Sequence, residues 1–158
     1  MTRLTPRFSA NRSVREYTEQ HYLPSATAYH LRMANKGAIG KQMVDWRHSL
    51  EQKWAALHFG ESKVETRGDQ HIFTVEVYLN DLDSNAVRVE LYADGVKGGT
   101  PVRQEMKRVR PLAGASGGTV YSAVASAARP PADYTARVIP HCGGVAVPLE
   151  AARILWQR

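Results

Sequence analysis

The stretch FTVEVYLNDLDSNAVRVELYA, residues 73–93, decides the fold that this chain is expected to adopt. Apolar and polar residues alternate from Phe73 to Leu79 and again from Val87 to Ala93, with the period of two that is typical of half-buried β-strands. Between these runs, residues 80–85 are mostly Asp, Asn and Ser, which favour turns. The stretch therefore predicts two strands joined by a turn.

Further short strands are predicted on both sides of this stretch, at intervals of about ten residues with turns between them. The segment 102–109 is polar on both faces apart from three residues, which suits a single edge strand rich in Lys and Arg. Seven short strands indicate an antiparallel immunoglobulin-like β-sandwich. The remaining predicted strands are 61–67, 119–126, 134–139 and 153–156.

Tyr134 follows the sequence Pro130-Pro131-Ala132-Asp133, which resembles a chain corner between two strands. In sandwiches of this kind, a tyrosine at such a corner donates its hydroxyl hydrogen to a backbone carbonyl a few residues upstream. We therefore expect Tyr134 to act as a tyrosine corner.

The first 60 residues have helical periodicity instead. The segment from Phe8 to Pro24 reads as an amphipathic helix, with Asn11 as its expected N-cap. Pro24 is expected to end the helix, because its ring disfavours helical geometry in the preceding residue. A second helical stretch begins near Ser25, and Lys36-Gly37 is expected to weaken or break it.

A third helical stretch has the strongest period in the chain. Its large apolar residues step by three or four positions, which places them on one stripe that favours packing against a neighbouring layer. Phe59-Gly60 is expected to stop this helix. The chain is thus expected to be α+β, with a helical arm over residues 1–60 and a sandwich over 61–158. The stripe consists of Ile39, Met43, Trp46, Leu50, Trp54 and Leu57.

The net charge of +6 comes mostly from the helical arm. Residues 1–60 hold nine Lys and Arg against four Asp and Glu, but the two signs are interleaved and form no basic run. This pattern does not favour nucleic-acid binding. No apolar run approaches the length of about 20 residues that spans a bilayer, and no signal peptide is expected. The single Cys142 fits a reducing compartment, so we expect a cytoplasmic protein with no membrane partner.

The motifs that could carry chemistry are incomplete. The segment Gly37–Lys41 lacks the spacing and the Ser or Thr of a phosphate loop, and the Gly-rich loop 114–118 is expected to be an ordinary loop. The six His residues form no metal-ligand pair on a helix, and His141-Cys142 lacks an orienting third group. We therefore expect no catalytic, cofactor-binding or metal-binding residue in this chain.

The segment Phe8–Arg12, followed by Arg15-Glu16-Tyr17, is the most distinctive in the chain. It resembles the carboxyl-terminal part of α-glucan phosphorylases, the glycogen and maltodextrin phosphorylase family, in their short bacterial form. The resemblance continues through the rest of the chain, although the individual motifs there are weaker. These further segments are Tyr22-Leu23-Pro24, the helix bearing Trp46 and Trp54, Tyr134–His141 and Leu155-Trp156.

The resemblance implies a parent enzyme that is a glycosyltransferase in carbohydrate metabolism. Such enzymes release glucose 1-phosphate from α-1,4-glucan and carry pyridoxal phosphate on a lysine. The family's lysine motif and catalytic domains have no counterpart in this sequence, so no cofactor is expected in this chain. The chain is therefore expected to be a non-catalytic fragment with a structural or assembly role. Its expected partners are the remaining phosphorylase polypeptide or a second copy of itself.

Two sets of residues are candidates for contacts. The expected domain-docking residues lie on the helical arm. The alternative interpretation is an immunoglobulin-like carbohydrate-binding module that binds α-glucan, with Tyr78 and Tyr92 stacking on sugar rings from the outer face; ordinary cross-strand pairing is the competing role for these tyrosines. The docking set is Arg12, Arg15, Tyr17, Trp46 and Trp54.

Overall fold

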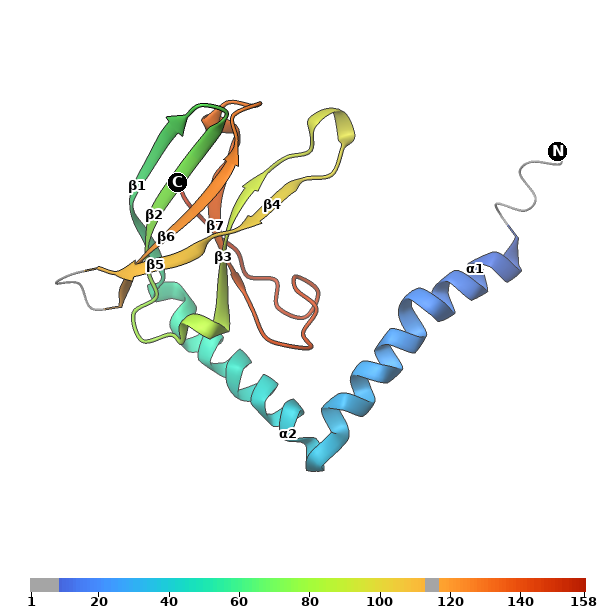
Figure 1. Ribbon diagram of the computed structural model, residues 1–158. Helices are drawn as coiled ribbons and strands as arrows, with labels where there is room; N and C mark the ends of the chain where they lie inside the picture. The colour runs from blue at the N-terminus through green and yellow to red at the C-terminus, as the bar shows by residue number, and fades with distance from the viewer. Residues whose placement is uncertain (1–8, 113–116) are drawn as a thin grey trace. The chain divides into compact units, whose positions relative to one another are not determined.

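The computed structural model describes residues 9–112 and 117–158. Its contacts divide the chain into two compact units, one ending at Asp45 and the other running from Trp46 to Arg158. The first unit is helical, and the second contains two antiparallel β-sheets (Figure 1). The α+β class and the order of helices before strands are thus confirmed. The part of the Gly-rich loop at 113–116 and the predicted helix start at Phe8 lie outside the described residues.

The first helix, α1 (Ala10–Tyr17), begins two residues earlier than the predicted cap implies. Ser9 is its N-cap, and the Ser9 hydroxyl accepts a hydrogen bond from the backbone N–H of Arg12 at 3.3 Å. The prediction of Asn11 as the cap is wrong, because Asn11 lies inside α1. Ser and Asn are comparable N-caps, so the local sequence offers two starts.

Pro24 does not end the helix, contrary to prediction. It lies in the first turn of α2 (Leu23–Lys53), which follows α1 through a π-helical turn, Thr18–Tyr22. A proline ring inside a helix collides with the carbonyl four residues earlier, which here belongs to Gln20. Gln20 lies in the wider π turn, where the Leu23 N–H bonds to the Thr18 carbonyl five residues back. The locally widened backbone accommodates the ring.

The predicted break near Lys36-Gly37 is confirmed. Residues 34–37 of α2 leave helical geometry, and the φ angles of Asn35, Lys36 and Gly37 are 52°, 58° and 75°. This left-handed region costs glycine little and is sometimes adopted by asparagine, whereas it is unfavourable for Lys36. Among the described helices, none combines the length and the apolar character needed to cross a bilayer.

The second unit contains two four-stranded antiparallel sheets. The first sheet has the order β1-β2-β6-β5, and the second has the order β4-β3-β7-β8. Inward-facing residues of both sheets, such as Val77 of β2 and Val138 of β7, form one core. The strands are β1 (His58–Arg67), β2 (Gln70–Tyr78), β3 (Val87–Ala93), β4 (Val102–Glu105), β5 (Lys107–Pro111), β6 (Gly118–Ser126), β7 (Thr135–Pro140) and β8 (Leu155–Trp156).

Two predictions about this unit are wrong. The single edge strand expected at 102–109 is two strands, β4 and β5, which form edges of different sheets. Met106 is buried between them, and its N–H donates to the Val89 carbonyl at 2.9 Å. Edge strands of either sheet are rich in charged residues, so the sequence pattern does not show that the chain passes from the second sheet to the first between β4 and β5.

The second error concerns the end of the helix. The α2 helix ends at Lys53, and after a 3₁₀ turn the chain enters β1, which contains Phe59 and Gly60. The register of β1 against β2 shifts between Phe59 and Ser62. Gly60 therefore marks a β-bulge instead of a helix stop.

The end of α2 packs on the sheets as part of the second unit. Leu50 is 1% exposed, and the indole N–H of Trp46 donates to the Ala86 carbonyl at 3.0 Å. Lys53 pairs with Asp81 at 3.0 Å, and this hydrogen bond lowers the pKa of the Asp81 carboxyl. The core role predicted for the apolar stripe is therefore confirmed from Trp46 to Leu57.

Replacing Leu50 tests this attachment of the helix to the sheets. We expect Leu50→Ala to lower the free energy of unfolding by about 2–5 kcal/mol, because it leaves a cavity in the core. Val44→Ala, at an exposed helical position, is the control and should change stability by less than about 0.5 kcal/mol. Urea unfolding measures both values. Equal effects would show that α2 does not belong to the core.

Tyr134 forms the predicted bond to the backbone. Its hydroxyl donates to the Ser126 carbonyl at 3.1 Å, and its ring packs on Phe73 with the centroids 5.3 Å apart. Tyr134 is buried. The bond joins the end of β6 to the start of β7, and these two strands belong to different sheets. The hydroxyl thus stabilises the connection by which the chain passes from the first sheet to the second.

We expect Tyr134→Phe to destabilise the protein by about 1 kcal/mol, because the Ser126 carbonyl loses its buried donor. Tyr78→Phe is the matched control, since the Tyr78 ring lies on a sheet's outer surface. It should leave the midpoint of urea unfolding unchanged. A Tyr134→Phe variant as stable as the parent would contradict the role of the hydroxyl.

Candidate functional site

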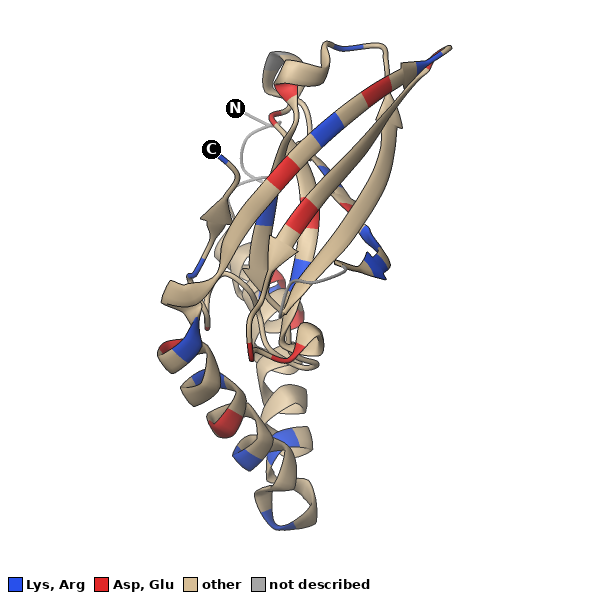
Figure 2. Cartoon of the chain, turned by 90° about the vertical axis from the view of Figure 1, so that its left-hand side faces the viewer, with Lys and Arg blue, Asp and Glu red and all other residues tan. Residues whose placement is uncertain are grey.

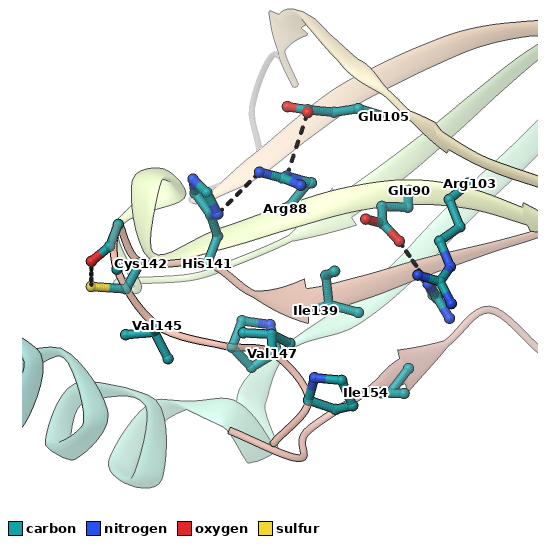
Figure 3. Close-up of a pocket in the computed structure, with 15 residues that line it drawn as sticks. Arg88, Glu90, Arg103, Glu105, Ile139, His141, Cys142, Val145, Val147 and Ile154 are labelled. Atoms are coloured by element: carbon teal, nitrogen blue, oxygen red, sulfur yellow. Dashed lines mark hydrogen bonds and ion pairs between the residues drawn. The ribbon is translucent and has the colours of Figure 1, made fainter. Parts of the chain in front are cut away.

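A pocket of about 650 Å³ lies on the outer face of the second sheet (Figure 3). Strands β3, β4 and β7 provide charged side chains on one side, because their outward positions alternate with buried apolar ones. The segment 140–154, which connects β7 to β8, provides apolar side chains on the other side. The lining residues used below are Arg88, Glu90, Arg103, Glu105, Arg137 and Ile139 from the strands, and His141, Val145, Val147 and Ile154.

A nearly buried ion pair forms one end of the pocket. Both Nε and Nη2 of Arg137 donate to one carboxylate oxygen of Glu90, at 3.1 and 2.8 Å. The Glu90 side chain is 8% exposed and the Arg137 side chain 11%. The guanidinium also lies 4.4 Å from the ring centre of Tyr92 and 5.2 Å from that of Trp156. Arg137 is therefore held by one carboxylate and two aromatic rings.

The other end of the pocket has a looser arrangement. Arg88 Nε lies 3.4 Å from a Glu105 carboxylate oxygen, and Arg88 Nη2 lies 3.1 Å from Nδ1 of His141. Arginine only donates hydrogen bonds, so Nδ1 of His141 is the acceptor.

Arg103 lies on the edge strand β4, directly opposite Tyr92 of β3. Within the described residues, neither pocket carboxylate pairs with Arg103. The Tyr92 hydroxyl donates to Asp94 at 2.9 Å, and this bond raises the pKa of Tyr92 above its ordinary value. The pocket thus combines three guanidinium groups with two carboxylates that are already paired.

The predicted docking residues fall in both units. Arg12, Arg15 and Tyr17 lie exposed on α1, where Arg12 pairs with Glu16 at 3.1 Å. Trp46 and Trp54 belong to the second unit and pack half-buried on its core. Their docking role stays a prediction.

The two tyrosines predicted to stack on sugars do not share a face. Tyr78 lies on β2 of the first sheet, where its ring stacks on His58 with centroids 4.5 Å apart. Tyr92 lies on β3 of the second sheet and meets the edge of Trp156. The turn at 80–85 carries the chain from one sheet to the other, so successive strands of similar pattern have outer faces on different sheets.

Other candidate chemistry is dispersed. His141 directs Nδ1 to Arg88, and the Cys142 sulfur contacts the Gly143 carbonyl at 3.8 Å. Among the described residues, no three His, Cys, Asp or Glu side chains gather as metal ligands. Figure 2 shows acidic and basic residues interleaved along the sheet surface.

Sequence reasoning did not identify the Glu90–Arg137 pair, Arg103 or Trp156 as members of one site. Their outward positions could be inferred from the alternation of β3 and β7. Their proximity depends on strand register, which places Glu90 opposite Arg137 and Arg137 opposite Trp156.

The two glutamates that lie opposite each other on β3 and β4 offer a matched test. We expect Glu90→Gln to lower the free energy of unfolding by about 2–3 kcal/mol, because Arg137 loses a nearly buried charged partner. Glu105→Gln should cost at most about 1 kcal/mol, since its side chain is 65% exposed. Urea unfolding at low salt compares them, and a larger loss for Glu105→Gln would contradict this assignment.

None of the protein-family models searched matches the chain. Three curated relatives share 27% identity with it over 148 residues. They are described as glycogen phosphorylase, from two strains of Mycobacterium tuberculosis and one of Mycobacterium bovis. The match covers 87% of this chain but only 17% of each relative. The chain is therefore similar to a segment of glycogen phosphorylase.

Proposed function

We propose that the chain is the carboxyl-terminal portion of an α-glucan phosphorylase of the short bacterial form. Its role is structural, and the isolated chain does not catalyse phosphorolysis. The observation that carries the proposal is the similarity to a segment amounting to 17% of glycogen phosphorylase, which agrees with the motifs from Phe8 to Tyr17. In such a parent enzyme, pyridoxal phosphate and the catalytic groups belong to other segments.

The surface of the first unit supports an assembly role. Between Ser9 and Asp45 no side chain is buried, although this segment holds many large apolar residues. Exposed apolar surface on this scale typically marks a protein interface. In the proposed role, this surface covers the remaining phosphorylase polypeptide, and Arg12 and Arg15 flank the contact. The exposed apolar residues are Val14, Tyr17, Tyr22, Leu23, Tyr29, Leu31, Met33, Ile39 and Val44.

We further propose that residues 61–158 form an immunoglobulin-like sandwich domain and that residues 1–60 are the end of the parent's catalytic region. The strand orders support this. Lettered along the chain, the first sheet reads A-B-E-D and the second C′-C-F-G, which is the immunoglobulin arrangement with one added edge strand. The Tyr134 bond to Ser126, before the strand in position F, supports it too. The single Cys142 supports a cytoplasmic location.

Carbohydrate binding is the second candidate function. The stacked pair of His58 and Tyr78 presents a flat aromatic surface on one sheet, and Trp156 meets Tyr92 edge to face on the second sheet. Aromatic surfaces of this type could hold an α-glucan. Affinity for maltooligosaccharide that falls when Tyr78 or Tyr92 is changed to Ala would support this function, and absence of binding would remove it.

The docking proposal is tested by mixing the chain with a mycobacterial glycogen phosphorylase truncated to lack the matched segment. We expect the two to associate, as measured by analytical ultracentrifugation, and the chain alone to show no phosphorolysis. Replacing Tyr17 and Tyr22 together by Ser should abolish association, because it removes apolar contact area. Tyr78→Ser in the second unit is the control.

The same experiment can contradict the proposal. A monodisperse chain that binds no apolar dye and does not associate with the truncated enzyme would remove the docking role. Phosphorolysis by the chain alone would overturn the non-catalytic assignment. Self-association that competes with the truncated enzyme would indicate that both use the first unit's apolar surface.

A further inference from the structure

We propose that the pocket on the second sheet binds a small organic anion, with a phosphate monoester or a carboxylate as its head and an apolar body. The site lies entirely within the second unit. It therefore does not rest on the proposed docking role of the first unit.

The balance of charge supports an anionic head group. Three arginines line the pocket, and its two glutamates are both engaged: Glu90 by Arg137 and Glu105 by Arg88. Arg103 has neither of these partners, and it lines the pocket from β4, opposite Tyr92 of β3 (Figure 3). An oxyanion placed at Arg103 would complete the neutralisation of the cluster.

The donors also suit an oxyanion in geometry. A guanidinium presents a planar fork of N–H groups that binds carboxylate or phosphate oxygens in pairs. Arg137 is already oriented by Glu90 and the two aromatic rings, so binding would cost little of its side-chain entropy. With Nδ1 of His141 accepting from Arg88, Nε2 is the ring nitrogen that can act as a further donor in the pocket wall.

The opposite wall argues for an organic ligand instead of a bare inorganic ion. Val145, Val147 and Ile154 contribute apolar side chains there, and Figure 3 shows them on the side away from Glu105. Ile139 of β7, opposite Arg88, adds apolar surface on the strand side. The volume of about 650 Å³ is within the usual range of small-molecule sites. A ligand that buries an apolar body on this wall would gain affinity beyond that of its head group.

A competing explanation assigns Arg103 only to protection of an exposed sheet edge, where charged side chains prevent strand pairing. An edge charge of that kind would attract any anion weakly and without dependence on the pocket. The two explanations therefore predict different results. Only a pocket gives saturable anion binding, and only a pocket binds an anion more tightly when the anion carries an apolar body.

The test is a titration of the intact chain with phenyl phosphate, benzoate and inorganic phosphate, followed by NMR of the arginine Nε–H groups. We expect saturable binding of at least one organic anion, several-fold tighter than inorganic phosphate. The stronger of phenyl phosphate and benzoate identifies the head group. Arg103→Gln should weaken binding about tenfold or more, because a charge-assisted hydrogen bond is lost. Arg103→Lys should give an intermediate loss.

Two controls separate the pocket from general charge. Arg110→Gln removes a cation from β5, an edge strand of the other sheet, and should leave binding unchanged. Ile139→Ala should weaken phenyl phosphate or benzoate without affecting inorganic phosphate. Thermal unfolding verifies that each variant remains folded.

Three outcomes would overturn the proposal. One is the absence of saturable binding of either organic anion at millimolar concentration. Another is equal weakening by Arg103→Gln and Arg110→Gln, which would assign the effect to net charge. The third is an Arg103→Gln variant that binds as well as the parent.

Discussion

The shared apolar core between the two sheets is the constraint on which the second unit depends. Val75 and Val77 of β2, Leu91 of β3 and Val138 of β7 are almost completely removed from water. Burial of this area is the main favourable term in folding. Because neighbouring residues of a strand point to opposite faces, fixing these residues inward also fixes their neighbours outward. The outer faces, where the candidate sites lie, are therefore a consequence of how the core is packed.

The Glu90–Arg137 pair shows how far this constraint reaches. Glu90 is in an outward position of β3, yet it is buried. Its carboxylate binds the Arg137 guanidinium, which lies over the ring of Tyr92. Pairing offsets the cost of removing both charges from water. The result is a polar surface with fixed side chains, a property that binding sites need and that ordinary exposed charges lack.

The two units differ in how far their apolar residues are buried. The stripe from Trp46 to Leu57 is covered by the sheets, whereas Tyr17, Tyr22 and their apolar neighbours in the first unit remain exposed. Most helical stability in proteins comes from packing of an apolar face. Between Ser9 and Asp45 the first unit buries no side chain, whereas the second unit encloses an apolar core.

The sequence by itself determined the α+β class, the break near Gly37, the alternating strands and the Tyr134 hydroxyl bond, because each depends on a local period or a local turn. Two local details differ from the prediction, because the local sequence offers two caps, Ser9 and Asn11, and because a π turn lets the helix pass Pro24. Tertiary structure decided the rest. The chain's crossing at Met106 assigned β4 and β5 to different sheets. The register of the second sheet brought Arg103, Glu90, Arg137 and Trp156 onto one surface. A period of two in the sequence specifies which face of a strand a residue takes, but it does not specify which strand lies beside it.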